Sequence, residues 1–367
     1  MAADEMKSPS ELQYRLLVGV GGIGTGMFFE LEGDHTLGRD ESRPGKLLDR
    51  RDYCKLHIIS HYVAVLLHAH QSGSPFRVLP IGKVGDDGPA DRLRREMAAA
   101  GMDISLVETA PGYPTLLSVC FQYPDGAGGN ITTTGSAASL LSATDIDRAK
   151  PAITAAGNQT IALGVPEVPL AARYHLLKLA GEHGAFRAAA IASAEVAEAI
   201  DMGLFEMVDL LSVNKDEAAT IAGEPFDEQD PEGFLAAVAV ALSDRQPEMQ
   251  IIVTAGASGA YAYSSGRWDY CPAFDTQPVS TAGAGDALLA GALAGLIGGL
   301  NFITPGPLRK SITDRPLTSA FDLGMLLAAV SVTSPHTIHP DASGEALLNF
   351  ATELGAAISE PLKVILG

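Results

Sequence analysis

The sequence predicts an α/β protein: a three-layer αβα sandwich with a mostly parallel central sheet and a small β-rich lid. Short apolar runs typical of buried strands alternate with longer stretches of helical periodicity. A parallel sheet needs crossover helices, and these cover both of its faces. Two polar segments, at about residues 27–48 and 115–134, interrupt the alternation. We therefore expect a single domain over residues 1–367, with a lid built from these two segments.

Each element has its own pattern. Strand patterns fall at residues 15–20, 76–81, 160–164, 185–191, 209–213 and 251–254. Helical patterns fall at residues 89–100, 170–183, 194–200, 215–222, 231–244, 285–298 and 317–333. In the second lid segment, extended runs at 116–123 and 130–134 flank a Pro-Asp-Gly turn at 124–126.

Composition limits the partners and the compartment. The net charge is −19, which argues against a nucleic-acid or anionic-membrane partner. The three cysteines lie far apart without metal-ligand spacing, which favours a reducing, cytoplasmic setting. The first ten residues are polar, unlike a secretion signal. The apolar run 287–300 is too short to span a membrane and is expected to be a core helix.

Residues 280–286 read Ser-Thr-Ala-Gly-Ala-Gly-Asp and stand at the head of that helix. Glycines and small residues let backbone N–H groups converge where the positive end of the helix dipole also points. Gly283, Ala284 and Gly285 are therefore expected to form an anion hole for a transferring phosphoryl group. Asp286 in the first turn is positioned to take a proton from an attacking hydroxyl.

This segment resembles the Asp-Thr-x-Gly-Ala-Gly-Asp signature of the PfkB, or ribokinase-like, carbohydrate kinases, with Ser280 in place of the first aspartate. The resemblance implies a kinase that transfers the γ-phosphoryl group of ATP to a hydroxyl of a sugar or related small polyol. It also implies that Asp286 is the general base and that Thr281 lies at the nucleotide. In the family the first aspartate often belongs to a monovalent-cation site, so Ser280 predicts weak K⁺ binding.

Residues 214–217, Asn-Lys-Asp-Glu, resemble the family's Asn-x-x-Glu motif and follow a predicted strand. In this interpretation Asn214 and Glu217 hold Mg²⁺, mostly through waters, beside the ATP phosphates. The same two residues also fit a capping box, in which Asn caps the helix and Glu bonds back to its amide. Both interpretations stay open from the sequence.

Two further segments resemble the family's nucleotide site. Residues 254–259 match a Thr-x-Gly-x-x-Gly turn, which places Thr254, Gly256 and Gly259 near the phosphates and ribose. The small residues of the stretch 328–333 resemble the helix that lines the adenine. The residues expected there are Ala328 and Ser331, with His336 closing the pocket.

Residues 19–24 match Gly-x-Gly-x-x-Gly after a strand, which raises the alternative of a nicotinamide-dinucleotide oxidoreductase with Asp40 at the ribose. That motif should open a helix, yet turn-forming residues follow it. In the PfkB enzymes the first strand ends in a loop at the sugar. Gly21 and Gly22 are then expected to let backbone approach the acceptor.

The acceptor pocket departs from the family pattern. The usual Gly-Gly and Asn are missing from residues 53–62, which contain His57 and His61 one helical turn apart. These two histidines, together with Asp34 and Asp40, are the acceptor-binding candidates. The spacing of the histidines also fits a metal pair, but it favours a partly exposed helix face. The departure leaves a non-catalytic PfkB-like protein that binds a sugar or a partner as the alternative, and a homodimer as a possible assembly.

Overall fold

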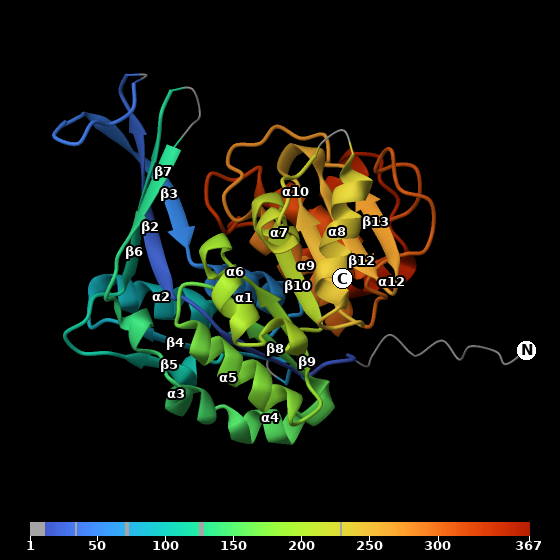
Figure 1. The fold of residues 1–367 in the computed structure, drawn as a ribbon, viewed down its shortest axis with the longest axis horizontal. Helices are drawn as coiled ribbons and strands as arrows, with labels where there is room; N and C mark the ends of the chain where they lie inside the picture. Colours follow the sequence, from blue (N-terminus) through green and yellow to red (C-terminus); the bar gives the residue numbers. More distant parts are fainter. Residues whose placement is uncertain (1–11, 34, 70–72, 125–127, 228–229) are drawn as a thin grey trace, which may run out of the picture.

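A computed structural model describes residues 12–33, 35–69, 73–124, 128–227 and 230–367. The turn positions 125 and 126 and the candidate Asp34 lie outside the described residues. The chain folds into a large central sheet with helices on both faces and a smaller sheet that projects from one side (Figure 1).

The central sheet has nine strands in the order β13-β12-β11-β10-β9-β8-β1-β4-β5. Pairing is parallel from β11 through β5 and antiparallel at β11–β12 and β12–β13. The strand bounds are β1 Leu16–Val20, β4 Arg77–Val84, β5 Val107–Thr109, β8 Thr160–Gly164, β9 Phe186–Ala190, β10 Leu210–Asn214, β11 Gln250–Thr254, β12 Ala260–Ser264 and β13 Arg267–Cys271.

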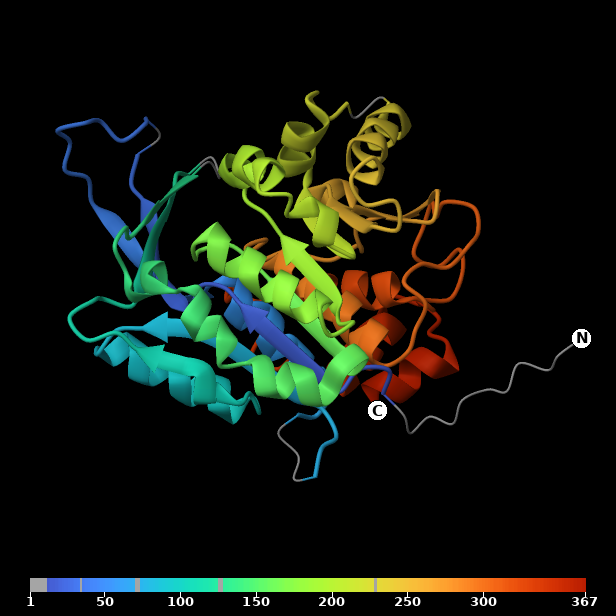
Figure 2. The same ribbon diagram turned by 60° about the horizontal axis from the view of Figure 1, so that its bottom comes forward.

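Alternate residues of the central strands face opposite helical layers. In β1, Leu17 packs into one hydrophobic cluster, whereas Leu16 and Val18 pack into the other. This period of two is what a strand buried on both faces requires. The two clusters are therefore the two interfaces of a three-layer sandwich, as the sequence predicts (Figure 2).

One layer contains α1, α2 and α9 to α12, and the other contains α3 to α8. The helix bounds are α1 Lys55–Leu66, α2 Gly88–Ala99, α3 Ala143–Asp147, α4 Lys150–Ala156, α5 Leu170–Gly181, α6 Val196–Asp201, α7 Lys215–Ala222, α8 Pro231–Ser243, α9 Ala284–Ile297, α10 Ala320–Ser331, α11 Gly344–Glu353 and α12 Glu360–Leu366. Short 3₁₀ turns span η1 Ile104–Leu106, η2 Ala137–Leu140, η3 Gly157–Gln159, η4 Ser193–Glu195, η5 Phe205–Met207 and η6 Gly256–Ser258.

The small sheet has four strands in the order β3-β2-β6-β7. Their bounds are β2 Gly24–Leu31, β3 Gly45–Tyr53, β6 Leu116–Gln122 and β7 Gly128–Thr132. These strands overlap the two segments in which the sequence predicts a lid. The register shifts between Gly26 and Phe28, where β2 pairs with β3, so the sheet is irregular close to its base.

The dinucleotide interpretation of residues 19–24 is wrong. The glycine segment leads into strand β2, so these glycines do not open the helix that the motif requires. Without that helix dipole the pyrophosphate of a dinucleotide has no binding site of the expected kind.

Helices α9 and α10 pack closely and fix the position of the predicted anion hole. A Cβ on Gly291 of α9 would lie 2.7 Å from the Cα of Gly324 in α10, so only glycines allow this crossing.

In the described part of the chain, none of the helices combines the length and the apolar character needed to cross a membrane.

Candidate active site

The carboxyl ends of the parallel strands carry most of the predicted site. Gly21 and Gly22 follow β1, Asn214 ends β10, and Thr254 ends β11. In open α/β sheets ligands bind beyond this edge of the strands. The first turn of α9 reaches the same edge, since a Cβ on Gly285 would lie 3.9 Å from the side chain of Thr254.

The N-terminus of α9 has the backbone geometry that an anion hole needs. Gly283 is its N-cap residue and has φ +81°, a left-handed conformation that favours glycine. No side chain caps the helix, and Gly285 is exposed. The amide of Ala284 donates to the carbonyl of Thr281 at 3.3 Å, whereas the later first-turn amides and the positive end of the helix dipole are available to an anion.

Asp286 lies in this first turn, and its side chain is 12% exposed. Its Oδ1 accepts a hydrogen bond of 3.0 Å from Nζ of Lys55, the first residue of α1. The carboxylates that raise the pKa of Lys55 are Asp286 first, then Glu167 and Glu217. One ammonium group therefore compensates three acids that come from three different elements.

Glu167 follows β8 and has φ +77°, a strained conformation for a residue with a side chain. Its Oε2 accepts a hydrogen bond of 3.2 Å from the backbone N of Lys55. A Cβ on Gly22 would lie 2.6 Å from that oxygen, so Gly22 makes room for the carboxylate. Burial raises the pKa of Glu167 to about 7, against the opposing effect of Lys55.

Asn214 and Glu217 form the capping box that the sequence left open. Oδ1 of Asn214 accepts from the backbone N of Asp216 and of Glu217, and Glu217 Oε2 accepts from the backbone N of Asn214 at 2.8 Å. Burial raises the pKa of Glu217, which also faces Lys55 and Asp286. Since the cap engages only one carboxylate oxygen, the second stays available to a cation.

The site around Glu217 fits a magnesium ion that takes only some of its ligands from the protein. The described residues contain no group of three or more His, Cys, Asp or Glu side chains with metal-binding geometry. Mg²⁺ characteristically uses one or two carboxylates, with waters and phosphate oxygens as its other ligands. Glu217, across from Asp286 and near the uncapped end of α9, would hold such an ion.

The predicted nucleotide residues gather around α9 and the loops beside it. Gly256 and Gly259 have φ +59° and +90°, which explains glycine at both positions of this turn. Thr281 is exposed at the head of α9, and Ala328 is partly buried in α10. Ser331 is buried and donates to the carbonyl of Ala328.

The structure places His336 against the small sheet. Its Nδ1 accepts a hydrogen bond of 2.9 Å from the backbone N of Arg51 in β3. The next residue, Thr337, accepts from the backbone N of Tyr53. The loop that contains His336, which is expected to close the adenine pocket, thus also accepts hydrogen bonds from β3 at the base of the small sheet.

The acceptor candidates are less well grouped. Asp40 is exposed and belongs to the connection between β2 and β3. This connection runs at the outer end of the small sheet, away from the carboxyl ends of the central strands (Figures 1 and 2). His57 is 0% exposed, which contradicts the expectation of a partly exposed face, although His61 is only partly buried. The ring of His57 packs 4.6 Å from that of Tyr53, and burial lowers the pKa of His57 to about 3.

Sequence reasoning missed three polar residues at the site, Lys55, Glu167 and Asp52. Two of them had a local signal in the sequence. Lys55 is the single charge at the head of an apolar helix. Glu167 comes shortly after the strand at 160–164 and lies between Pro166 and Pro169. Asp52 had none, because it lies in a charged run at 49–52 whose other members are exposed or partly exposed.

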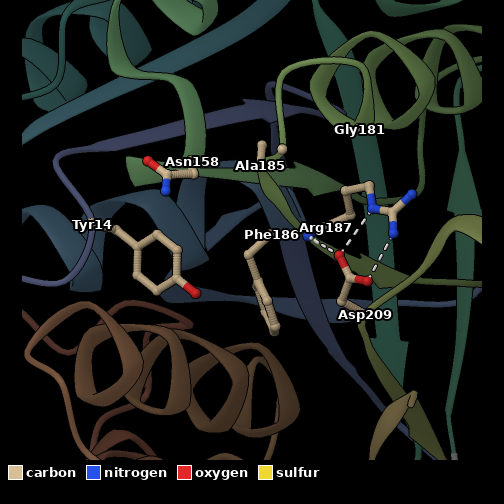
Figure 3. A pocket seen from close by; sticks show the side chains of 8 residues that line it. Tyr14, Asn158, Gly181, Ala185, Phe186, Arg187 and Asp209 are labelled. Atoms are coloured by element: carbon tan, nitrogen blue, oxygen red, sulfur yellow. Dashed lines mark hydrogen bonds and ion pairs between the residues drawn. The ribbon is translucent and has the colours of Figure 1, made fainter.

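A second hollow lies at the opposite edge of the central sheet (Figure 3). It is lined by Tyr14 and Phe186 among others, at the amino ends of β1 and β9. Its charged groups, Arg187 and Asp209, bind one another through two hydrogen bonds of 2.8 and 2.9 Å. This hollow is separate from the edge that carries Asp286.

Comparison with known proteins identifies the family. Residues 63–343 match the pfkB family of carbohydrate kinases, and the chain belongs to this family. Deoxyribokinases of Salmonella typhi and Salmonella typhimurium are 30% identical over 213 residues, which make up 58% of this chain. The match spans 66% of the length of these relatives.

Solved structures share the fold at lower sequence identity. Ribokinase from Giardia lamblia superposes with a TM-score of 0.71 at 14% identity, covering 88% of this chain and 93% of its own. Ribokinase from Cryptococcus neoformans, in complex with ADP, has a TM-score of 0.69 at 20% identity, with 92% and 99% covered. A nucleoside kinase from Burkholderia thailandensis, in complex with inosine, has a TM-score of 0.66 at 16% identity. The superposition covers 93% of this chain and 99% of that kinase.

Proposed function

We propose that this chain transfers the γ-phosphoryl group of ATP to a hydroxyl of a sugar or related small polyol. The observation that carries the proposal is the first turn of α9. There an uncapped helix N-terminus, shaped by Gly283, adjoins a carboxylate held by Lys55. An anion hole beside a proton acceptor is the combination that phosphoryl transfer to an alcohol uses.

In the proposed reaction, Asp286 accepts the proton of the acceptor hydroxyl. The hydroxyl oxygen bonds to the γ-phosphorus as the bond from that phosphorus to the leaving oxygen of ADP breaks. The amides of Gly283, Ala284 and Gly285 stabilise negative charge on the transferring group. Magnesium near Asn214 and Glu217 would neutralise charge on the phosphates.

The ammonium of Lys55 lies beside both the base and the anion hole. It holds the Asp286 carboxylate in place through a hydrogen bond and adds positive charge at the centre where charge develops. The small sheet would exclude water from this centre when it closes over bound acceptor.

The test is a phosphorylation screen with ATP and Mg²⁺ over sugars, polyols and nucleosides, followed by ADP release. We expect one acceptor class to give turnover that disappears in Asp286→Asn. Binding of a sugar without ADP release above the background would instead identify the non-catalytic alternative.

Compartment and assembly are also proposals. Cys54, Cys120 and Cys271 are free thiols, which fits a reducing, cytoplasmic setting. Leu47 of β3 and Ile131 of β7 are 57% and 66% exposed on the small sheet. Such apolar exposure supports a homodimer through this sheet, which size-exclusion chromatography with light scattering would test.

A further inference from the structure

Asp52, near the end of β3, lies where the small sheet meets the anion-hole turn. The backbone of Tyr53 and the hydroxyl of Thr337 lie near its carboxylate and act to lower its pKa. The carbonyl of Thr337 in turn lies 2.9 Å from the position of a Cβ on Gly283. On its other side the Asp52 carboxylate fills the space that a side chain on Gly26 of β2 would need. Asp52 therefore lies at the point where β3 of the small sheet approaches the turn that precedes Asp286.

Asp52 has no cationic partner among the residues that the structure describes. Lys55 compensates Asp286, Glu167 and Glu217, but the charged group that acts on Asp52 is Asp286, another acid. Burial raises the pKa of Asp52 to about 6, and the negative charge of Asp286 adds to this effect. A partly buried carboxylate without a cation costs free energy unless a ligand donates to it.

Arg50 and Arg51, close to Asp52 in sequence, and Arg92 of α2 have other partners. The guanidinium of Arg50 lies 5.6 Å from the centre of the Phe28 ring. Arg51 and Arg92 lie 3.9 and 4.0 Å from Glu96 of α2. Arg92 also donates to the hydroxyl of Thr25. These guanidinium groups are engaged at the base of the small sheet, and Lys55 acts on Asp286, Glu167 and Glu217, so Asp52 is left without a compensating cation.

We propose that Asp52 binds the acceptor, and that this chain selects uncharged or amino-bearing polyhydroxy acceptors against those that carry a phosphate or a carboxylate. The inference rests on the proposed function and specifies its substrate class. A carboxylate only accepts hydrogen bonds, so its ligand must donate, as hydroxyl and ammonium groups do. A second anion on the acceptor would lie beside Asp52, whose carboxylate no side-chain cation compensates, and would be repelled by it.

The experiment compares wild type, Asp52→Asn and the control Asp49→Asn, which changes an exposed acid on the same strand. The acceptor probes are ribose with ribose 5-phosphate, and glucose with glucosamine and glucuronate. In Asp52→Asn we expect the acceptor KM to rise by about tenfold or more, with the KM for ATP unchanged. We also expect the preference for the uncharged over the phosphorylated or acidic probe to shrink by about tenfold. Asp49→Asn should match wild type.

Acceptor binding is measured in parallel by calorimetry with ADP and Mg²⁺ present, so turnover is not required. Turnover with an unchanged acceptor KM and unchanged discrimination in Asp52→Asn overturns this inference and leaves the proposed function intact. A phosphate ester or sugar acid as the best wild-type ligand also overturns it. Absence of turnover on every probe rejects the proposed function, and calorimetry then decides whether Asp52 still governs ligand choice. If Asp52→Asn fails to fold, Asp52→Ser replaces it in the same comparison.

Discussion

The ammonium of Lys55 donates a 3.0 Å hydrogen bond to Asp286, although 231 residues separate the two in sequence. Lys55 begins α1 and Asp286 lies in the first turn of α9, so the contact joins the N-terminal ends of two helices in the same layer. Both helix dipoles direct positive potential to this point. The pair is thus the electrostatic centre from which the following predictions start.

Asp286→Asn removes the proposed proton acceptor while keeping the size of the side chain. We expect turnover to fall by about 10²–10⁴, the usual effect of losing a general base, with the KM for ATP within a few-fold of wild type. Steady-state kinetics over the best acceptor provide the measurement. The exposed Asp244→Asn is the matched control, and a variant at Asp286 that keeps more than half of wild-type turnover would remove it from this role.

Lys55→Met removes the ammonium that compensates Asp286, Glu167 and Glu217. Turnover should fall by about 10²–10³, the scale of losing one electrostatic stabiliser, and Lys55→Arg should recover part of it. Because Lys55 lowers the pKa of Glu167 and of Glu217, its loss should also move the rising limb of the pH–rate profile to higher pH. An unshifted profile in Lys55→Met, matching that of the exposed Lys178→Met, would contradict this reasoning.

Glu217→Gln separates the two functions of the capping box. Glutamine can still accept from the backbone N of Asn214, so the melting temperature should change little. If Glu217 holds magnesium, half-saturation by Mg²⁺ should rise by about tenfold and turnover should fall. A helix cap alone predicts unchanged turnover and magnesium dependence in Glu217→Gln, with a stability loss of roughly 1 kcal/mol only in Glu217→Ala, which cannot accept the cap bond. Asp216→Asn in the same first turn controls for the loss of one charge.

The sequence predicts the parts of the fold that are encoded by contiguous residues. The run 160–164 coincides with β8, and residues 283–286 contain both the anion-hole turn and the acid. Sequence reasoning missed the hairpin of β12 and β13. In the structure its turn residues, Ser265 and Gly266, have φ +50° and +79°, the conformation of a tight hairpin turn. Its strands mix tyrosine with polar residues at a sheet edge, so they lack a long apolar run.

The acceptor side could not be predicted in the same way. Lys55, Glu167 and Asp52 come from three separate elements, and their roles follow from charges that meet only in the folded chain. His57 illustrates the opposite error, since a polar residue at helical spacing suggested a surface, yet it packs beneath Tyr53. A single sequence shows neither which polar residues are buried nor which charges they face.

Ser280 predicts that potassium has little effect. Its hydroxyl is neutral and already accepts a 3.4 Å hydrogen bond from the backbone N of Ala282. Desolvating K⁺ requires charge or several carbonyl oxygens in return. Exchanging Na⁺ for K⁺ at constant ionic strength should therefore change activity by less than about twofold, and Ser280→Asp should introduce a K⁺ response. Strong activation of the wild type by K⁺ would show that another residue supplies the charge.

Glu167 predicts a stability that falls as the pH rises. Its pKa is about 7 in the folded chain, above the ordinary 4.5, so the folded state keeps a proton that the unfolded state releases between these values. The unfolded state then binds fewer protons, and the free energy of unfolding decreases across this window, by up to about 3 kcal/mol for this group. Glu167→Gln lacks this titration, while Asp52 and His57 titrate in both proteins.

Urea unfolding at pH 5 and pH 8 measures the effect as a difference between the two proteins. Relative to wild type, Glu167→Gln should gain stability on going from pH 5 to pH 8, because only the wild type must ionise a buried carboxylate there. Glu182→Gln, at the exposed residue that follows α5, should follow the wild-type curve. Parallel pH dependence of wild type and Glu167→Gln would mean that Glu167 is already ionised at pH 5. In that case Lys55 compensates it fully, and the protonated carboxyl inferred from its burial does not form.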